Sequence, residues 1–160
     1  MPKPRVYVET TIPSAYYTDR NDPAMVKRRD ATRKWWSVAT VASDLVTSPA
    51  VLRELSNGTS PHVPARLRLL SDLPVLEITP AVMSPAATYV ARRIMPAHPF
   101  EDALHLALAS HHACDALATW DFRHLANPAK FLVIQRINTE FHLPVPLIAS
   151  PAYLLGGSNV

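Results

Sequence analysis

Short apolar runs alternate along the chain with longer segments of helical pattern. The apolar runs cover residues 6–8, 45–47, 75–78, 116–119 and 147–149, and their length is typical of buried strands. Between them lie segments with helical composition, at residues 24–43, 49–57, 64–73, 80–94, 101–114 and 129–141. Parallel strands need crossovers, which are normally helical. The alternation therefore predicts an α/β fold, a parallel sheet of four to five strands sandwiched by helices.

Proline and glycine mark where these elements begin and end. Proline fixes φ and lacks an N–H group, so it suits the first turn of a helix or a connection. Pro23, Pro49 and Pro80 each follow a capping residue, and Ile12-Pro13-Ser14 predicts a turn after the first strand. The chain has only three glycines, which argues against the glycine-rich phosphate loops of nucleotide-binding folds.

Composition restricts the class of protein further. Hydrophobic residues make up 48% of the chain and charged residues 18%, which predicts a compact core and excludes a disordered protein. We find no repeat and no linker, so we expect a single domain over residues 1–160. No apolar run approaches the roughly 18 residues of a membrane span, and Met1–Arg5 does not resemble a signal peptide. These features predict a cytoplasmic protein with no membrane partner.

Cysteine content and net charge add two limits. Cys114 is the only cysteine, which excludes an intramolecular disulfide and a zinc ribbon and favours a buried core thiol. The formal net charge is +3 and the pI is about 9.2. This charge would help a polyanion approach but is too small to identify one as the partner.

Acidic residues follow the predicted strands. Glu9 ends the first strand, Glu54 lies on the helix after the second, Asp121 follows the fourth, and Asp102 opens the helix before it. Sites in such sheets lie outside the carboxyl ends of the strands, so we expect these side chains to meet. Clustered carboxylates raise one another's pKa unless cations are present. Oxygen ligands favour Mg²⁺ or Mn²⁺, which predicts metal-assisted phosphodiester hydrolysis.

Each carboxylate also has a purely structural explanation. Asp102, like Glu101, would stabilise a helix dipole by about 0.3–1 kcal/mol, and Asp121 would cap the turn that follows it. Glu54 on an amphipathic helix is most simply a solvated residue. A purely structural explanation is harder to find for Glu9. A charge at the end of a buried strand is costly unless it is paired with an arginine or coordinated.

Histidines offer a different metal site. His105 lies three residues after Asp102, and His111, His112 and His124 are among the histidines that follow it. A zinc hydrolase would require a close pattern such as His-Glu-x-x-His, which the chain lacks. We therefore expect His98 and His105 near the cleft only as supporting groups.

Four segments together resemble the PIN-domain family. Residues 101–109 and 114–125 look like the C-terminal half of these proteins, residues 6–14 like their opening strand and acidic motif, and residues 48–55 like their second acid-bearing helix. The resemblance extends over about residues 6–154. It implies a parallel sheet between helices, Mg²⁺- or Mn²⁺-dependent ribonuclease activity, and frequent homodimers.

The resemblance also assigns roles to residues. It places the four family acids on Glu9, Glu54, Asp102 and Asp121, and a hydroxyl that organises them on Thr119. Glu9, Asp102 and Asp121 would hold the metal, while Glu54 would bind a metal water or a second ion. Glu9-Thr10-Thr11 stands where the family usually has Asp-Thr-Asn, and it is similar to a subgroup that opens Glu-Thr-Thr-Ile-Pro-Ser.

Within the family, the chain looks like VapC-like toxins, which implies an RNA substrate and a cognate antitoxin protein. Candidate contacts to the RNA backbone are Arg5, Arg53, Arg123 and the basic cluster Lys27–Lys34. Trp35 and Trp36 fit core packing or a dimer face better than base stacking. A catalytically weak PIN-like module that binds RNA or protein is the alternative. A phosphatase with an aspartyl nucleophile ranks last, because the first strand ends in Glu9.

Overall fold

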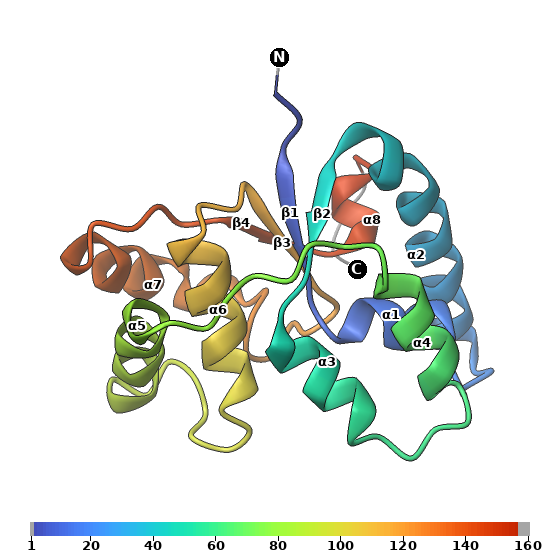
Figure 1. The fold of residues 1–160 in the computed structure, drawn as a ribbon, viewed down its shortest axis with the longest axis horizontal. Helices are drawn as coiled ribbons and strands as arrows, with labels where there is room; N and C mark the ends of the chain where they lie inside the picture. The colour runs from blue at the N-terminus through green and yellow to red at the C-terminus, as the bar shows by residue number, and fades with distance from the viewer. Residues whose placement is uncertain (1, 157–160) are drawn as a thin grey trace.

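A four-stranded parallel sheet forms the centre of the computed structural model, which describes residues 2–156 (Figure 1). The strand order is β2-β1-β3-β4. The strands are β1 (Arg5–Val8), β2 (Asp44–Val46), β3 (Ala116–Ala118) and β4 (Leu147–Ala149). Tyr7 of β1 aligns with Val46 of β2 and with Leu117 of β3. The predicted α/β architecture is thus confirmed.

The strand predicted at residues 75–78 does not form, and that prediction is wrong. Val75 makes only an isolated parallel bridge with Thr47, beyond the end of β2. The contact consists of the Thr47 N–H bonded to the Pro74 carbonyl at 3.0 Å and the Leu76 N–H bonded to the Thr47 carbonyl at 2.8 Å. Pro74 has no N–H group to extend the hydrogen-bond ladder. Val75 is 51% exposed, so a fifth strand here would gain little stability from apolar burial.

Eight helices surround the sheet in the described part of the chain. They are α1 (Thr11–Tyr16), α2 (Pro23–Ala42), α3 (Pro49–Ser56), α4 (Val63–Leu70), α5 (Pro80–Ala91), α6 (Glu101–His111), α7 (Pro128–Glu140) and α8 (Pro151–Leu154). Figure 1 shows α5, α6 and α7 on one side of the sheet and α1, α2, α4 and α8 on the other. No helix within residues 2–156 is both long and apolar enough to cross a bilayer.

Proline and buried apolar residues explain the helix boundaries. Six of these helices carry proline at their first or second position, as predicted. Helix α1 was expected to be only a turn. Pro13 lies in its first turn, where its missing N–H is not required, and Ile12 and Ala15 are buried against the core. Tertiary burial therefore stabilises a helix that the local turn signal concealed.

Helix α6 is the most deeply buried element. All its residues from Asp102 to Ser110 are buried, and Ala103, Ala107 and Ala109 are fully inaccessible. Small side chains let this helix approach its neighbours closely. As a result, the polar residues on α6 have fixed positions inside the protein.

Three helices end in Schellman motifs without glycine. Arg93, Ala113 and His142 have φ values of 61°, 54° and 56° after α5, α6 and α7. In each motif the next N–H bonds back across the helix end, as from Cys114 to the Ala109 carbonyl at 2.9 Å. A side chain in this left-handed region costs roughly 1 kcal/mol relative to glycine.

We predict that Ala113→Gly raises the free energy of unfolding by about 1 kcal/mol, because Ala113 is exposed and loses only the backbone strain. The matched control is Ala87→Gly at an exposed position inside α5, which should lower the free energy of unfolding by about 0.5–1 kcal/mol. Urea denaturation of both variants measures the difference. A loss of stability in Ala113→Gly would contradict the strain argument.

Candidate metal centre

The adjacent strands β1 and β3 bring two predicted residues together at their carboxyl ends. Glu9 directly follows β1, and its N–H extends the ladder to the Ala118 carbonyl at 3.3 Å. Thr119 directly follows β3 and is fully buried. Its hydroxyl donates to Glu9 Oε2 at 2.8 Å. The parallel register therefore fixes this part of the site.

One oxygen of Glu9 is saturated with hydrogen bonds. In addition to Thr119, Glu9 Oε2 accepts from the Thr11 hydroxyl at 2.5 Å and the Thr11 N–H at 3.1 Å. No residue within the described range donates to Oε1, which remains available to a ligand. Burial raises the pKa of Glu9, although His105 and the threonine hydrogen bonds partly oppose it. The salt bridge to an arginine that we considered as an alternative does not occur in the described structure.

Glu54 is held by a chain of buried polar groups. Its Oε1 accepts from the Thr10 hydroxyl at 2.6 Å and lies 2.5 Å from His105 Nε2. His105 is fully buried, and its Nδ1 lies 2.8 Å from the Tyr7 hydroxyl. That hydroxyl in turn lies 2.7 Å from Ser48 Oγ. The chain fixes the Glu54 carboxylate, which is thus more than a solvated helix residue.

His105 and Glu54 influence each other's ionisation. Burial alone would lower the pKa of His105, but the Glu54 hydrogen bond and the nearby carboxylate charges outweigh burial and raise it. Burial tends to raise the pKa of Glu54, yet its bonds to His105 and Thr10 lower it. Both ring nitrogens of His105 already have partners, so the ring acts here as a supporting group, as expected from the sequence.

Asp102 shows the clearest need for a cation. It lies in the first turn of α6, is only 7% exposed, and receives no side-chain hydrogen bond from any described residue. Burial, followed by the charges of Asp121, Glu9 and Glu54, raises its pKa to about 7, with His105 opposing. A divalent ion bound to these oxygens would relieve this repulsion, so the residues fit such an ion.

Asp121 serves as a cap and retains a free oxygen. Its Oδ1 accepts from the backbone N–H groups of Arg123 at 3.0 Å and His124 at 2.9 Å. Thr119 Oγ1 accepts from the Asp121 N–H at 2.9 Å, which ties this residue to the Glu9 hydroxyl network. No described residue donates to Oδ2. The capping explanation is therefore correct for one oxygen and leaves the other for a metal.

The predicted residues differ in how closely they meet. Ligand atoms of Glu9, Glu54 and His105 lie within 4.8 Å of one another. Asp102 and Asp121 lie outside that tight group, but the charges of all the carboxylates act on Asp102. Sequence reasoning missed the roles of Thr10, Thr11, Tyr7 and Ser48. The signal for His105 was its position three residues after Asp102, which places both on one helix face.

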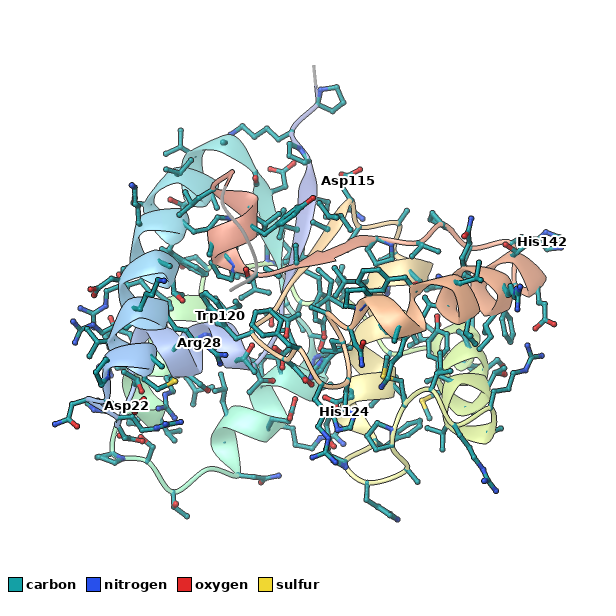
Figure 2. All side chains as sticks on the ribbon, turned by 180° about the vertical axis from the view of Figure 1, so that it is seen from behind. Asp22, Arg28, Asp115, Trp120, His124 and His142 are labelled. Carbon is teal, nitrogen blue, oxygen red and sulfur yellow. The ribbon has the colours of Figure 1, made fainter. Side chains whose placement is uncertain are left out.

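Other residues singled out from the sequence lie elsewhere or are held by neighbouring groups. Arg5 begins β1, at the opposite end of the strand from Glu9, and bonds the His112 carbonyl. In the basic cluster, Arg28 lies 5.2 Å from the centre of the Trp120 ring, and Figure 2 shows the two side by side. Trp35 is buried in the core. Burial raises the pKa of the Cys114 thiol to about 11, as expected for an inert core cysteine.

Comparison with known families agrees with this geometry. The PIN domain family model matches residues 6–130. The matched segment is most of the chain and contains β1, β2, β3 and all four predicted carboxylates. A search of curated proteins finds no significant match. PIN domains are typically nucleases that use divalent metal ions and act on RNA. Both the family match and the carboxylate geometry show that this chain belongs to the PIN domain family.

Proposed function

We propose that the protein is a Mg²⁺- or Mn²⁺-dependent endoribonuclease that hydrolyses RNA phosphodiester bonds. The observation that carries the proposal is the Asp102 side chain, which is 7% exposed, accepts no side-chain hydrogen bond from any described residue and lies in the field of three other carboxylates. Such an arrangement is unfavourable without a cation and is suited to binding one. Family membership adds the reaction class.

Glu9, Asp102 and Asp121 would hold the ion through oxygens to which no described residue donates. When bound, the ion lowers the pKa of a coordinated water and neutralises negative charge on the phosphoryl oxygens. Thr119 and Thr11 orient Glu9 by occupying its Oε2. His105 and Thr10 occupy Glu54 Oε1, and no described residue donates to Glu54 Oε2, which would accept a hydrogen bond from a metal-bound water.

We extend the proposal to biological context. The resemblance to VapC-like proteins and the Glu9-Thr10-Thr11 opening support the toxin of a type II toxin–antitoxin pair, with a cognate antitoxin and a cytoplasmic location. Exposed apolar side chains on α7 and near β4 support a homodimer: Phe131, Leu132, Val145 and Leu147. We further propose that residues 1–160 act as one domain.

A binding module with weak or absent catalysis is the second candidate. Two observations favour it: Glu9 has only one free oxygen, and His105 places a basic group beside Glu54. The first feature leaves fewer oxygens to bind a metal ion, and the second offsets part of the negative charge that a metal ion would neutralise. An assay that separates the candidates incubates the protein with end-labelled single-stranded RNA in Mn²⁺, Mg²⁺ or EDTA, with a phosphomonoester as a parallel substrate. Metal-dependent cleavage of the RNA without hydrolysis of the phosphomonoester supports the endoribonuclease.

We predict that millimolar Mn²⁺ or Mg²⁺ raises the melting temperature. An ion that binds only the folded state at about 100 times its Kd stabilises it by about 2.7 kcal/mol, which is roughly 5–10 °C for a chain of this size. Calorimetry with metal and with EDTA measures the shift. An unchanged melting temperature would favour the binding module.

Asp102→Asn should abolish metal-dependent RNA cleavage while it raises the melting temperature of the metal-free protein. The amide keeps the side-chain volume and removes a charge that Asp121, Glu9 and Glu54 repel. The matched control is Glu101→Gln on the preceding residue of α6, which should cleave at nearly the wild-type rate. Wild-type cleavage by Asp102→Asn would show that the site is wrongly assigned.

Glu9 can be tested with a pair of substitutions. Glu9→Gln should reduce the cleavage rate severely because it removes the charge, whereas Glu9→Asp should keep part of the activity. Shortening the side chain displaces the carboxylate by about 1 Å, which costs on the order of a hundredfold. Rates and melting temperatures are measured together. A large loss of stability with unchanged activity per folded molecule would assign Glu9 a structural role only.

A further inference from the structure

A surface pocket of about 390 Å³ lies beside the carboxylates. It is formed by the end of α5, the loop that leads to α6, and two residues beyond Asp121. Among the residues that line it are Arg93, Ile94, Met95, Pro96, His124 and Lys130. Its volume is in the range of small-molecule sites, about 300–1,000 Å³.

The pocket is linked to the carboxylates through His124. His124 lines the pocket, and its N–H donates to Asp121 Oδ1 at 2.9 Å. Lys130 Nζ donates to the His124 carbonyl at 3.3 Å, and the Lys130 charge interacts with Asp121 and Asp102. Figure 2 shows His124 beside the loop between α5 and α6. The pocket therefore shares His124 with the immediate surroundings of Asp121.

Arg93 occupies the pocket in a costly backbone conformation. Its φ of 61° places it at the left-handed position of the Schellman motif after α5, where glycine is preferred. Arg93 is exposed and forms no ion pair with any described residue. The preceding Arg92, in contrast, pairs with Glu140 at 2.6 Å. Arg93 therefore brings to the pocket a guanidinium that has no ion-pair partner among the described residues.

The lining chemistry indicates which ligand. Ile94 and Met95 are buried and form an apolar floor, and Pro96 adds a further apolar surface. Two cations, Arg93 and Lys130, flank this floor. An apolar surface suits a nucleobase and the cations suit its phosphates, whereas a duplex would keep its bases stacked and out of reach.

We propose that this pocket binds the nucleotide of single-stranded RNA next to the scissile phosphate, with its base on Ile94, Met95 and Pro96 and a phosphate on Arg93 and Lys130. The assignment rests on the proposed ribonuclease function. It deepens that function by identifying where the substrate leaves the metal centre. It also explains why arginine stands at position 93, where the left-handed backbone conformation favours glycine.

Binding is tested with a fluorescein-labelled single-stranded RNA 12-mer in Mg²⁺, on an Asp102→Asn background that does not cleave. Arg93→Ala should weaken binding by about tenfold, the equivalent of roughly 1.4 kcal/mol for a charge-assisted phosphate contact. The slope of log K against log salt should become shallower by about 0.7, as expected for one lost contact to a single strand. Arg92→Ala removes the same charge from a neighbouring residue outside the pocket and should change affinity less than twofold and leave the slope unchanged.

Arg93→Gly separates binding from folding. Glycine suits a φ of 61°, so this variant should melt at or above the temperature of its parent while it loses RNA affinity as Arg93→Ala does. Equal RNA affinities and equal salt slopes for the Arg92 and Arg93 variants would contradict RNA binding in the pocket. They would not contradict the proposed ribonuclease function. If the Asp102→Asn protein does not bind RNA and the wild-type protein does not cleave it, both the pocket and the proposed ribonuclease function are wrong.

Small ligands test the apolar floor. Adenosine 5′-monophosphate should displace the labelled RNA at a concentration several times lower than ribose 5-phosphate does, because only the nucleotide carries a base. Equal competition by the two compounds would overturn the placement of a base in the pocket.

Discussion

The parallel pairing of β1 with β3 is the constraint on which the site depends. The pairing aligns Val8 with Ala118, so Glu9 and Thr119 leave the sheet side by side. A shift by one residue would turn Glu9 to the other face and separate it from the Thr119 hydroxyl. Buried strands with apolar contacts on both faces resist such a shift. The hydrophobic core therefore determines where the carboxylate lies.

Helix α6 imposes a second constraint from the side of the sheet. Asp102 and His105 are three residues apart on a helix whose residues from Asp102 to Ser110 are all buried. His105 reaches Tyr7 on β1 and Glu54 on α3, so one imidazole connects three elements. Hydrogen bonds of this kind offset the free-energy cost of burying polar groups in a core and hold these groups in one orientation.

Much of this arrangement was predictable because it follows from local patterns. The α/β class follows from the alternation of strands and helices, and the helix starts follow from proline, whereas the role of Thr119 beside Glu9 was implied only by the family resemblance. Residues 75–78 misled us because strand formation depends on a free ladder donor, which Pro74 lacks. Helix α1 depends on burial of Ile12, a tertiary effect. The Tyr7–His105 contact joins residues 98 positions apart, and neither residue predicts it alone.

The hydrogen bonds on Glu9 limit how it can coordinate. Glu9 Oε2 and Asp121 Oδ1 are both engaged by the protein, so each carboxylate offers a single oxygen. Mg²⁺ prefers six oxygens in octahedral geometry and keeps several waters. If each carboxylate gave one oxygen, a bound Mg²⁺ would keep coordination positions for water and phosphate oxygens. In the proposed ribonuclease, these positions are where an RNA phosphate would take the place of a water molecule.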